Sequence, residues 1–546
     1  MRLTVEGEAG ARVLVEHGEV LGPGRAWDNR NYRSARAALD CTLRGGAPET
    51  CAPHFTFMGF RYARVTVTGR ARVAAIESVP ISSVPEQAGS FECGHPLVNR
   101  LVLNTVWSQR ANFIEVPTDW PQRGERLGWT GDAQVFAGTA CWLADSHAFL
   151  CKHLRDVMAD QRADGAIPHF SPDPTRLHPV EGRGEWAGST GWGDAIAVIP
   201  WQLWLHYGDR DVPRACFPAM IRWLDYVWSI SDGPVVTPDP AWGAKGFTLG
   251  DWLQPQMQPG QKDNQKAAPT IGDDAAATIC HFVTTALVAR IARVLGEDGE
   301  AGRLAARAAE IKRAFAHEFI TPAGRVGGGD QTSYALSLLH DLVPEEHREA
   351  AARQFARAVE EAGGCIGTGF IGTPALLPAL TRLGLHDLAA RVFLNERIPG
   401  WLYQVKMGAT TIRERWDALA PDGTIFNPGM NSYNHYAYGA VCQWLFEDVA
   451  GLRRSADGPG FARLDLDPAV IPALGFVRAR HASPRGEVAA ERRVADGRVT
   501  YAVTLPEGCE GRFEPKGRRD VTLGGEARRG AFALGPGTHE IGFAAP

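Results

Sequence analysis

The stretch EEHREAAARQFARAVEEAGG, residues 345–364, shows the fold class of the largest part of the chain. Apolar residues recur in it every three to four positions, charged residues fill the positions between, and two glycines close it. This pattern predicts an amphipathic helix that ends at the glycine pair. The other segments with the same period lie near 95–112, 132–145, 147–162, 192–207, 213–230, 272–295, 299–318, 331–340, 373–383, 386–397 and 433–449.

About twelve helices joined by long loops predict an (α/α)6 toroid, in which six helical hairpins form a double ring. A simple helical bundle or a solenoid is the alternative, but the sequence shows no repeat of fixed period. The irregular stretches 171–189 and 254–270 are rich in Pro, Gly and Gln. In a toroid, such loops gather at one rim and build a pocket.

The two ends of the chain read as β structure. Before residue 90, Phe55, Phe57, Tyr62 and Val65 belong to an alternating apolar pattern, and Gly-Gly pairs supply turns. In the last hundred residues, alternating apolar positions from 499 to 505 follow an Asp-Gly turn.

We therefore predict a multidomain, mainly α chain. An N-terminal β-sandwich would occupy residues 1–90, the central (α/α)6 toroid residues 91–452, and a C-terminal β-sandwich residues 453–546. This architecture is common among enzymes that act on carbohydrates, but a fold alone does not establish a function.

The composition of the chain argues against some classes of function. The chain has 546 residues, 57 Lys and Arg against 62 Asp and Glu, and a net charge of -5. This mild acidity without basic runs argues against nucleic-acid binding. The longest nearly apolar stretch, 195–205, is shorter than the roughly 18 residues of a membrane span. The first residues lack a basic, then apolar, leader pattern, and ten scattered Cys contain no CxxC pair, so we expect a cytoplasmic protein with reduced thiols.

The densest group of polar and aromatic residues is PTDWPQRGERLGWTGDAQVF, residues 117–136. Its two prolines oppose helix, its glycines allow tight turns, and a helical pattern begins at Asp132. A group that protonates a sugar must be held beside residues that tune it and near an aromatic wall. The residues leave two interpretations open. One is such an acid site, and the other is an ion-paired loop in which Asp132 caps the helix.

A second segment, GATTIRERWDALAPDGTIFNPGMNSYNHYAYGAVCQWLF, residues 408–446, again places carboxylates beside aromatic residues. Glu414 and Asp417 flank a tryptophan, and His435 lies in a Tyr-rich turn before the last helix. Two carboxylates far apart in sequence, each beside aromatics, are what acid/base hydrolysis of a sugar requires. The alternatives are an ion pair between Glu414 and a neighbouring arginine, and a core histidine at position 435.

Residues 117–136 resemble the signature of bacterial α-L-rhamnosidases, glycoside hydrolase family 78, in which a run similar to DCPQRDERLGWTGDAQ opens the active site. The second segment resembles the ATTIWERWD stretch of that family and the N-S-x-N-H-x-A-x-G turn after it. The stretches HFTFMGFRYARVTV and SFECGHPLVNRLVLNTVWSQRANFIEVPTDWPQR resemble its sandwich and lead-in helix. The resemblance covers nearly the whole chain in the same order.

The resemblance implies that Glu125, in the ERxGW run, is the general acid and that Glu414, in the ERWD run, is the general base. Trp192, in a GWGDA stretch, and Trp252, in a GDW stretch, resemble aromatic walls of the sugar subsite. The residues with implied sugar-binding roles are Asp119, Arg123, Trp129, Asp132 and His435. These residue types suit rhamnose, because its methyl group needs an apolar wall and its hydroxyls need polar partners.

The chain departs from the family pattern at Trp120, where Cys is usual, and at Gly124, where Asp is usual. We assign chemistry to neither position, although an acid at 124 would have tuned its neighbour Glu125.

We expect no metal and no cofactor. The chain is short for the family and shows no calcium-dependent carbohydrate-binding module. Asp145, His147, Cys151 and His153 form a candidate metal cluster, but their uneven spacing on amphipathic helices favours a structural role.

The expected activity is that of an inverting exo-α-L-rhamnosidase, which releases terminal α-L-rhamnose from glycosides or oligosaccharides. One alternative is another (α/α)6 hydrolase of the glucoamylase or trehalase type. A second is a non-catalytic carbohydrate-binding relative, against which the presence of both glutamates counts. Nothing in the sequence favours one oligomeric state.

Overall fold

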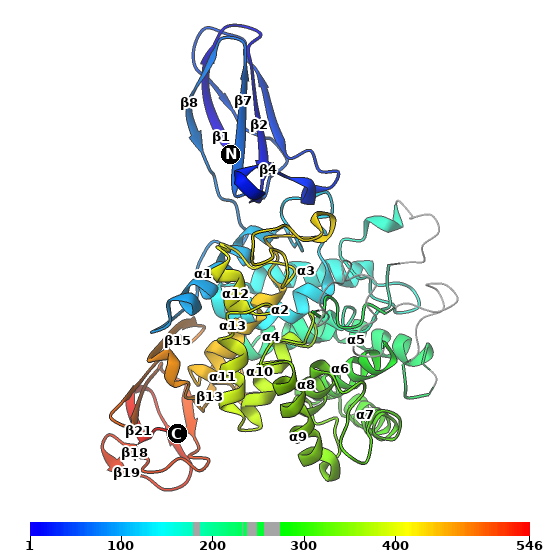
Figure 1. Cartoon of the computed structure of the whole chain (residues 1–546). Helices are drawn as coiled ribbons and strands as arrows, with labels where there is room; N and C mark the ends of the chain where they lie inside the picture. Colours follow the sequence, from blue (N-terminus) through cyan, green and yellow to red (C-terminus); the bar gives the residue numbers. More distant parts are fainter. Residues whose placement is uncertain (178–185, 232, 237–247, 256–272) are drawn as a thin grey trace.

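The computed structural model describes the chain in five stretches, residues 1–177, 186–231, 233–236, 248–255 and 273–546. An N-terminal β domain projects from a large helical body, and the C-terminal β domain packs on another side of that body (Figure 1). This arrangement confirms the predicted multidomain fold, in which two sheet domains flank a central toroid.

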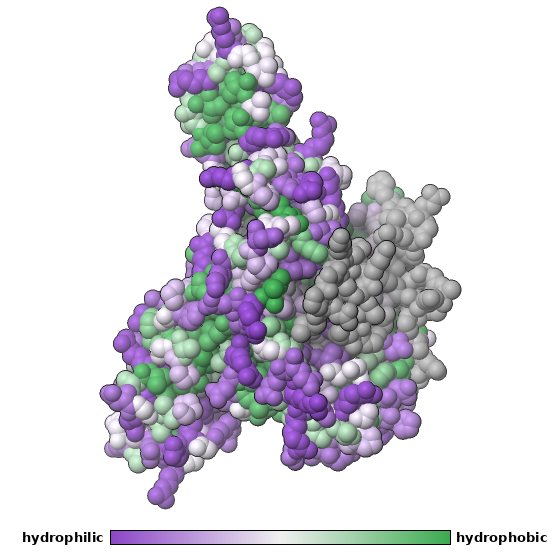
Figure 2. Space-filling model, in the orientation of Figure 1, coloured by the Kyte–Doolittle hydropathy of each residue, from purple (hydrophilic) through white to green (hydrophobic). Residues whose placement is uncertain are grey.

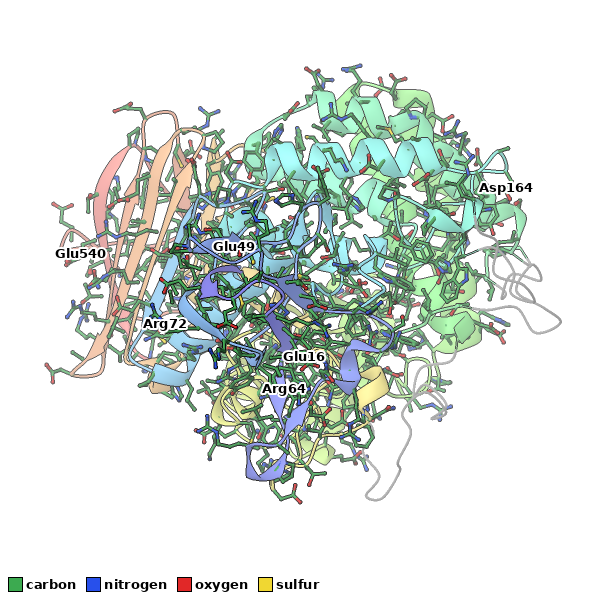
Figure 3. The ribbon with its side chains drawn as sticks, turned by 90° about the horizontal axis from the view of Figure 1, so that it is seen from above. Glu16, Glu49, Arg64, Arg72, Asp164 and Glu540 are labelled. Atoms are coloured by element: carbon green, nitrogen blue, oxygen red, sulfur yellow. The ribbon has the colours of Figure 1, made fainter. Side chains whose placement is uncertain are left out.

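The N-terminal domain contains two small three-stranded antiparallel sheets around a shared apolar core. One sheet has the strand order β6-β1-β8 and the other the order β5-β2-β7. The strands are β1 (Arg2–Gly7), β2 (Arg12–Gly18), β5 (Ala38–Thr42), β6 (Glu49–Cys51), β7 (Tyr62–Thr68) and β8 (Ala71–Glu77). Leu3, Val5, Val13 and Val15 are fully buried between the sheets. Cross-strand ion pairs line the outside, such as Arg64 with Glu16 at 2.7 Å (Figure 3).

Apolar side chains are also exposed on the edge strands β7 and β8 of this domain. Val67 is 42% exposed and Ile76 is 48% exposed, and Figure 2 shows apolar residues gathered on this domain. The predicted alternation is wrong for its first half, because the strand starts at Tyr62. The preceding residues instead run along the toroid, where the N–H of Gly59 donates to the carbonyl of Pro121 at 3.2 Å.

The helical body is a double ring. The inner helices are α2 (Thr130–Leu143), α4 (Ala195–Tyr207), α6 (Asp273–Leu295), α8 (Gln331–Leu339), α10 (Thr373–Arg382) and the helical segment 437–449. The outer helices are α1 (Pro96–Asn112), α3 (His147–Asp160), α5 (Asp211–Ser229), α7 (Asp298–Phe319), α9 (Glu345–Glu361) and α11 (His386–Phe393). Each inner helix contacts the next, and the segment 437–449 contacts both α10 and α2, which closes the ring.

Two helical predictions differ from the structure. The short helix α12 (Trp401–Lys406) was not expected. The last helix begins at residue 437 rather than 433, because the N–H of His435 donates to the carbonyl of Ile412 at 2.8 Å, which attaches the backbone before the helix to the second motif. The segment then passes through 3-10, α and π turns.

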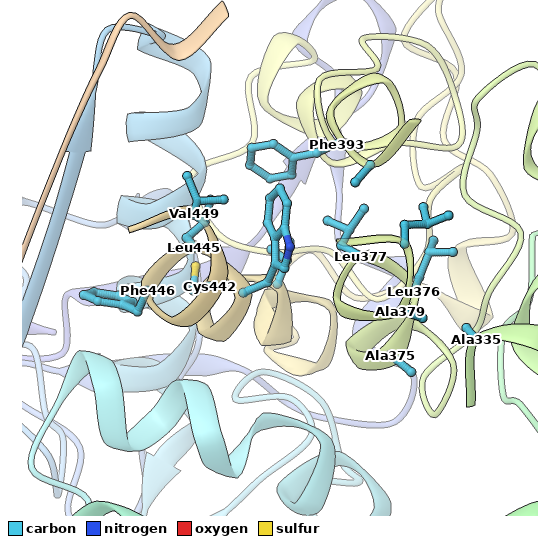
Figure 4. Packing of buried hydrophobic residues seen from close by; sticks show 14 of the residues in the cluster. Ala335, Ala375, Leu376, Leu377, Ala379, Phe393, Cys442, Leu445, Phe446 and Val449 are labelled. Atoms are coloured by element: carbon cyan, nitrogen blue, oxygen red, sulfur yellow. The ribbon is translucent and has the colours of Figure 1, made fainter. Parts of the chain in front are cut away.

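The core of the double ring is continuous and apolar. Figure 4 shows Leu377 on the side of α10 toward Leu445 and Phe393, with Leu376 and Ala335 of α8 on the opposite side. All except Phe393 come from inner-ring segments. The helix α6 is long and apolar enough to cross a membrane, but 72% of its apolar window is buried inside the ring, as in a core helix of a globular domain.

The C-terminal domain contains a seven-stranded sheet, β19-β18-β21-β16-β15-β14-β9, and a four-stranded sheet, β12-β13-β17-β20. The long strands are β14 (Phe476–Ser483), β15 (Gly486–Ala495), β16 (Arg498–Leu505) and β21 (Gly537–Ala544). The short strands are β12 (Arg453–Arg454), β13 (Arg463–Leu466), β17 (Glu510–Phe513), β18 (Thr522–Leu523), β19 (Glu526–Ala527) and β20 (Phe532–Leu534). As predicted, Asp496 and Gly497 form a hairpin turn at positive φ, 50° and 72°.

One strand of the large sheet comes from before the toroid. The strand β9 (Gly89–Cys93) pairs antiparallel with β14. The toroid is therefore inserted between two neighbouring strands of one sheet. The domain boundaries that we placed at residues 90 and 452 stay predictions.

Candidate active site

The first motif forms a closed loop that leads into α2. The backbone N–H of Asp119 donates to the carbonyl of Leu127 at 3.0 Å, and the N–H of Leu127 donates back to Asp119 Oδ1 at 3.1 Å. A Cβ atom at Gly128 would lie 2.3 Å from the carbonyl oxygen of Ser171, so only glycine fits there. The loop thus holds the side chains between Asp119 and Leu127 in one compact turn.

Glu125 is held by two arginines. Its Oε2 accepts a hydrogen bond from Arg123 Nη2 at 2.9 Å and another from Arg33 Nη1 at 2.9 Å. The side chain is 21% exposed, so the carboxyl is accessible from solvent. Arg33 belongs to the N-terminal domain, and no sequence pattern indicated this contact, because it joins two domains.

Arg123 is the cation at the centre of the motif. It is fully buried, lies on the face of the Trp120 ring, and bonds Glu125. Its Nε and Nη1 atoms have no hydrogen-bond partner among the described residues. Burial lowers the pKa of Arg123 to about 10, although the negative charges of Glu414 and Glu125 oppose this shift. Trp120, to which we assigned no role, is thus part of the site's wall.

Glu414 is held by a backbone segment rather than by an arginine. Its N–H donates to the carbonyl of Ser432 at 3.0 Å, and the N–H of Ser432 donates to Glu414 Oε2 at 3.1 Å. The neighbouring Arg415 instead pairs with Asp417 at 2.9 Å. Burial raises the pKa of Glu414 to about 7, against the opposing positive charge of Arg123. This carboxyl therefore titrates near neutral pH, as a general base should.

The two motifs meet in a contact between Asp132 and His435. Nε2 of His435 lies 2.9 Å from Asp132 Oδ1, and both side chains are buried. Asp132 lies in the first turn of α2, whose N-cap is Trp129, so it does not cap the helix. The His435 ring also contacts Trp120 and Phe370, at centroid distances of 5.6 and 5.1 Å. It is a buried histidine, but one with a carboxyl partner from the other motif.

The carboxyls of the site act on one another. Burial raises the pKa of Asp119 well above its ordinary value, and the negative charges of Glu125 and Asp132 raise it further. Because Asp119 also feels Arg123 and Glu414, these groups share one electrostatic neighbourhood. A cluster of carboxyls around one buried cation is typical of an acid/base site.

A second residue of the N-terminal domain reaches the backbone segment that holds Glu414. Glu19 Oε2 accepts hydrogen bonds from Asn31 Nδ2 at 2.7 Å and from the N–H of Tyr433 at 3.3 Å. Consecutive N–H groups, those of Ser432 and Tyr433, therefore bind two different buried carboxyls. Burial raises the pKa of Glu19 to about 8. No pattern in the sequence distinguished Glu19 from the other polar residues of a β domain.

The predicted aromatic residues have different surroundings. Trp129 is partly buried and meets Phe170 and Trp186 edge to face, at 5.1 and 6.0 Å between centroids. Trp192 is 2% exposed and packs on Gly131, where a Cβ would lie 2.5 Å from its ring. Trp252 is partly buried, and its carbonyl accepts a hydrogen bond from the backbone of the ring segment before α10. Their roles as sugar walls stay predictions.

Three family models together match almost the whole chain. The bacterial α-L-rhamnosidase concanavalin-like domain matches residues 1–82, the six-hairpin glycosidase domain of the same enzymes residues 86–449, and their C-terminal domain residues 451–522. The chain belongs to the bacterial α-L-rhamnosidase family.

Curated members of the α-L-rhamnosidase family align over nearly all of this chain. The α-L-rhamnosidase of Streptomyces avermitilis is 36% identical over 93% of this chain and 46% of its own length. An α-L-rhamnosidase of Formosa agariphila is 32% identical over 94% of this chain and 53% of its own length. The chain thus spans about half the length of the curated relatives that it matches.

Solved structures of α-L-rhamnosidases share the fold. The crystal structure of the Streptomyces avermitilis enzyme complexed with L-rhamnose matches with a TM-score of 0.86 and 35% identity, and covers 99% of this chain and 50% of that one. The structure of the Aspergillus terreus enzyme matches with a TM-score of 0.86 and 29% identity, over 99% of this chain and 60% of that one.

Metal binding remains a separate question for this α-L-rhamnosidase family member. Among the residues that the structure describes, no group of three or more His, Cys, Asp or Glu side chains is placed to hold an ion. In the candidate cluster on α3, His147 pairs with Asp209 at 2.9 Å, and Cys151 lies 3.8 Å from the same ring nitrogen. The expectation of no required metal stays a prediction.

Proposed function

We propose that this chain hydrolyses terminal α-L-rhamnosides with inversion, with Glu125 as general acid and Glu414 as general base. The observation that carries the proposal is the arrangement around Arg123. Its guanidinium bonds Glu125, and its positive charge acts on buried Glu414, whose pKa lies near 7. Membership of the α-L-rhamnosidase family supports the substrate class.

In the proposed reaction, Glu125 gives a proton to the glycosidic oxygen as that bond breaks. Glu414 takes a proton from a water molecule that attacks the anomeric carbon from the opposite face of the sugar. An inverting pair needs a separation of about 6.5–9.5 Å between carboxyls to leave room for this water. Glu414 is suited to this role because a base with a pKa close to the working pH is both ionised and strong enough to accept the proton.

Asp132, His435 and Trp129 are proposed to bind the rhamnose. The Asp132–His435 pair offers polar atoms to the sugar hydroxyls, and the indole of Trp129 offers an apolar surface to the methyl group. These side chains come from both motifs, which explains why both are needed in one site.

A panel of nitrophenyl glycosides tests the substrate class. Cleavage of the α-L-rhamnoside supports the proposal. Cleavage of the α-glucoside instead would favour a hydrolase of the glucoamylase or trehalase type. Sugar binding without turnover of any substrate would indicate a non-catalytic relative.

Proton NMR in the first minutes of hydrolysis tests the stereochemistry. The expected first product is β-L-rhamnose, formed before mutarotation mixes the anomers. An initial α-anomer would reject inversion even if the substrate class were right, and Asp417 would then be the next residue to examine as a nucleophile.

A further inference from the structure

A separate pocket lies at the junction between the N-terminal domain and the toroid. Its volume is about 490 Å³, within the usual range of small-ligand sites. We call it the junction pocket. Its walls include Phe60, Arg61 and Tyr62 from the N-terminal domain, and Arg100, Trp107 and Arg413 from the toroid.

The junction pocket carries uncompensated positive charge. Arg61 donates to the carbonyl of Gly408 at 2.9 Å, and Arg413 donates to the carbonyl of Met407 at 3.1 Å. Within the described part of the chain, neither these two arginines nor Arg100 lies within ion-pair distance of a carboxylate. Many other arginines of the chain, from the N-terminal strands to the C-terminal sheet, do pair with an acid.

The acid in the wall of this pocket does not cancel that charge. Glu19 lines the pocket, but burial raises its pKa to about 8, so it is mostly protonated at neutral pH. The net charge of the lining at pH 7 is therefore positive, which favours an anionic ligand.

Arg413 provides the strongest indication of a ligand. Its side chain is 3% exposed, and its Nη1 has no hydrogen-bond partner among the described residues. A buried donor without a partner costs roughly 1–3 kcal/mol. An acceptor that enters the pocket and meets this nitrogen would remove that cost. A carboxylate suits the flat guanidinium because it can accept two parallel hydrogen bonds.

The rest of the lining suits a sugar ring. Trp107 is 43% exposed on α1, and Phe60 and Tyr62 add further ring surface. Aromatic faces bind the apolar faces of flat rings, while Thr411 and Asn434 supply polar atoms in the same wall. Inorganic phosphate would use the arginines but not the aromatic rings.

We propose that the junction pocket binds a sugar that carries a carboxylate, such as a hexuronic acid. This inference does not rest on the proposed activity, because the site is distinct from the catalytic residues. The segment 432–434 separates the two. The N–H of Ser432 bonds Glu414 on the catalytic side, whereas Tyr433 and Asn434 line the junction pocket.

Isothermal titration of the whole protein with sodium D-glucuronate at low salt tests the proposal. We expect saturable binding that D-glucose does not reproduce, since glucose lacks the carboxylate. Binding should persist when L-rhamnose saturates the catalytic site. Methyl β-D-glucuronide shows whether the pocket prefers a glycosidically linked uronic acid or the free monosaccharide. Tighter binding than the free acid indicates a glycosidically linked residue, and equal binding indicates the monosaccharide.

Surface variants keep the test independent of folding. Trp107→Ala and Arg100→Met should each weaken glucuronate binding by about fivefold or more, because each removes one recognition element from the pocket. Leu103→Ala is the matched control for Trp107, because it is equally exposed, at 43%, on the same helix and does not line the pocket. Circular dichroism confirms that each variant is folded.

Three results would overturn the proposal. The first is no detectable glucuronate binding at about 20 mM, a concentration that would nearly saturate a site with a Kd of about 1 mM. The second is displacement of glucuronate by L-rhamnose, which would place it in the catalytic site. The third is equal competition by inorganic phosphate, which would reduce the site to a cluster of charge without sugar recognition.

Discussion

Glu125 and Glu414 are held in different ways, and the difference matches their proposed roles. Glu125 is partly exposed and bonded to two guanidinium groups. Glu414 is buried and bonded to a backbone N–H. A proton donor must reach the oxygen that joins the sugar to its varied leaving group, whereas a base needs to reach only a water molecule.

The role of Glu125 can be tested through the leaving group. Glu125→Gln should reduce turnover of alkyl rhamnosides by about 10²-fold or more, but turnover of nitrophenyl rhamnoside much less, because an aryloxide leaves with little protonation. Steady-state kinetics on both substrates measures the ratio. Equal losses on both would remove Glu125 from the acid role.

The raised pKa of Glu414 predicts the acidic side of the pH profile. A base must be ionised to work, so kcat/KM should fall as the pH drops below about 7, the pKa that burial gives this carboxyl. The measured value belongs to the cluster as a whole, because neighbouring carboxyls interact. An acidic limb centred near pH 4–5, where ordinary carboxyls titrate, would show that Glu414 is not the limiting base.

The contact between Asp132 and His435 predicts strong coupling. Asp132→Asn and His435→Ala should each lower kcat/KM on α-L-rhamnosides at least about tenfold, equivalent to about 1.4 kcal/mol. The double variant should lose clearly less than the product of the two single losses, because each change already breaks the same pair. Purely multiplicative losses would mean that the two residues act separately.

Much of the site could be predicted from sequence, because its residues cluster in two short motifs. Asp132 and His435 were both singled out, although their mutual contact was not. Glu19 and Arg33 could not be found in this way. Each reaches the site only through contact between two domains, and its neighbours in sequence carry an unremarkable β pattern.

At the level of elements, the loop that carries Arg33 connects the N-terminal domain to Glu125. The residue follows a short 3-10 turn, Arg30–Tyr32, and adopts a positive φ of 55°. Its side chain also donates to the carbonyl of Gly429, so one arginine joins both motifs. The loop therefore contributes to the orientation of Glu125.

Arg33→Met should lower kcat by about three- to tenfold with a smaller change in KM, because Glu125 loses one of the two groups that orient it. Arg30→Met is the control. Arg30 lies in the same turn but pairs with Asp28, and its side chain is 69% exposed. Kinetics on nitrophenyl α-L-rhamnoside compares the two variants. If both behaved alike, the contact with Glu125 would have no functional effect.

Helices were the elements best predicted from sequence, because a period near 3.6 persists over many residues in each. The elements that were missed are those whose backbone is determined by distant partners. Residues 55–60 leave the predicted strand to contact the loop at Pro121, and residues 433–436 lie outside the predicted helix, where the N–H of His435 bonds the carbonyl of Ile412. Local patterns carry no information about such contacts.

For the whole molecule, Glu19 makes the stability of the contact between the N-terminal domain and the toroid depend on pH. Its pKa is raised from the ordinary 4.5 to about 8 in the folded protein. A carboxyl whose pKa is higher in the folded than in the unfolded protein stabilises the fold. This contribution is fully present below the pKa of the unfolded protein and is lost as the pH rises through the pKa of the folded protein. The free energy of unfolding should therefore decrease as the pH rises from about 5 to about 8.

Glu19→Gln removes this ionisation and keeps an acceptor for Asn31 and Tyr433. The drop in Tm between pH 5 and pH 8 should be smaller in the variant than in the wild type. Each kcal/mol of unfolding free energy that the variant keeps at pH 8 corresponds to about 2–4 °C in Tm. Differential scanning calorimetry at the two pH values measures it. Glu16→Gln, on the surface of the same domain, should keep the wild-type pH dependence. Identical slopes for wild type and Glu19→Gln would contradict the assignment.

The position of β9 has a consequence for how the chain is made. This strand is synthesised before the toroid, but its partner β14 is synthesised only after it. At 5–20 residues per second, β9 waits on the order of 20–80 s on the ribosome with an unpaired edge. Such an edge attracts other strands. Chains released before β14 is made keep β9 uncovered, so this sheet closes only after the C-terminal domain has been synthesised.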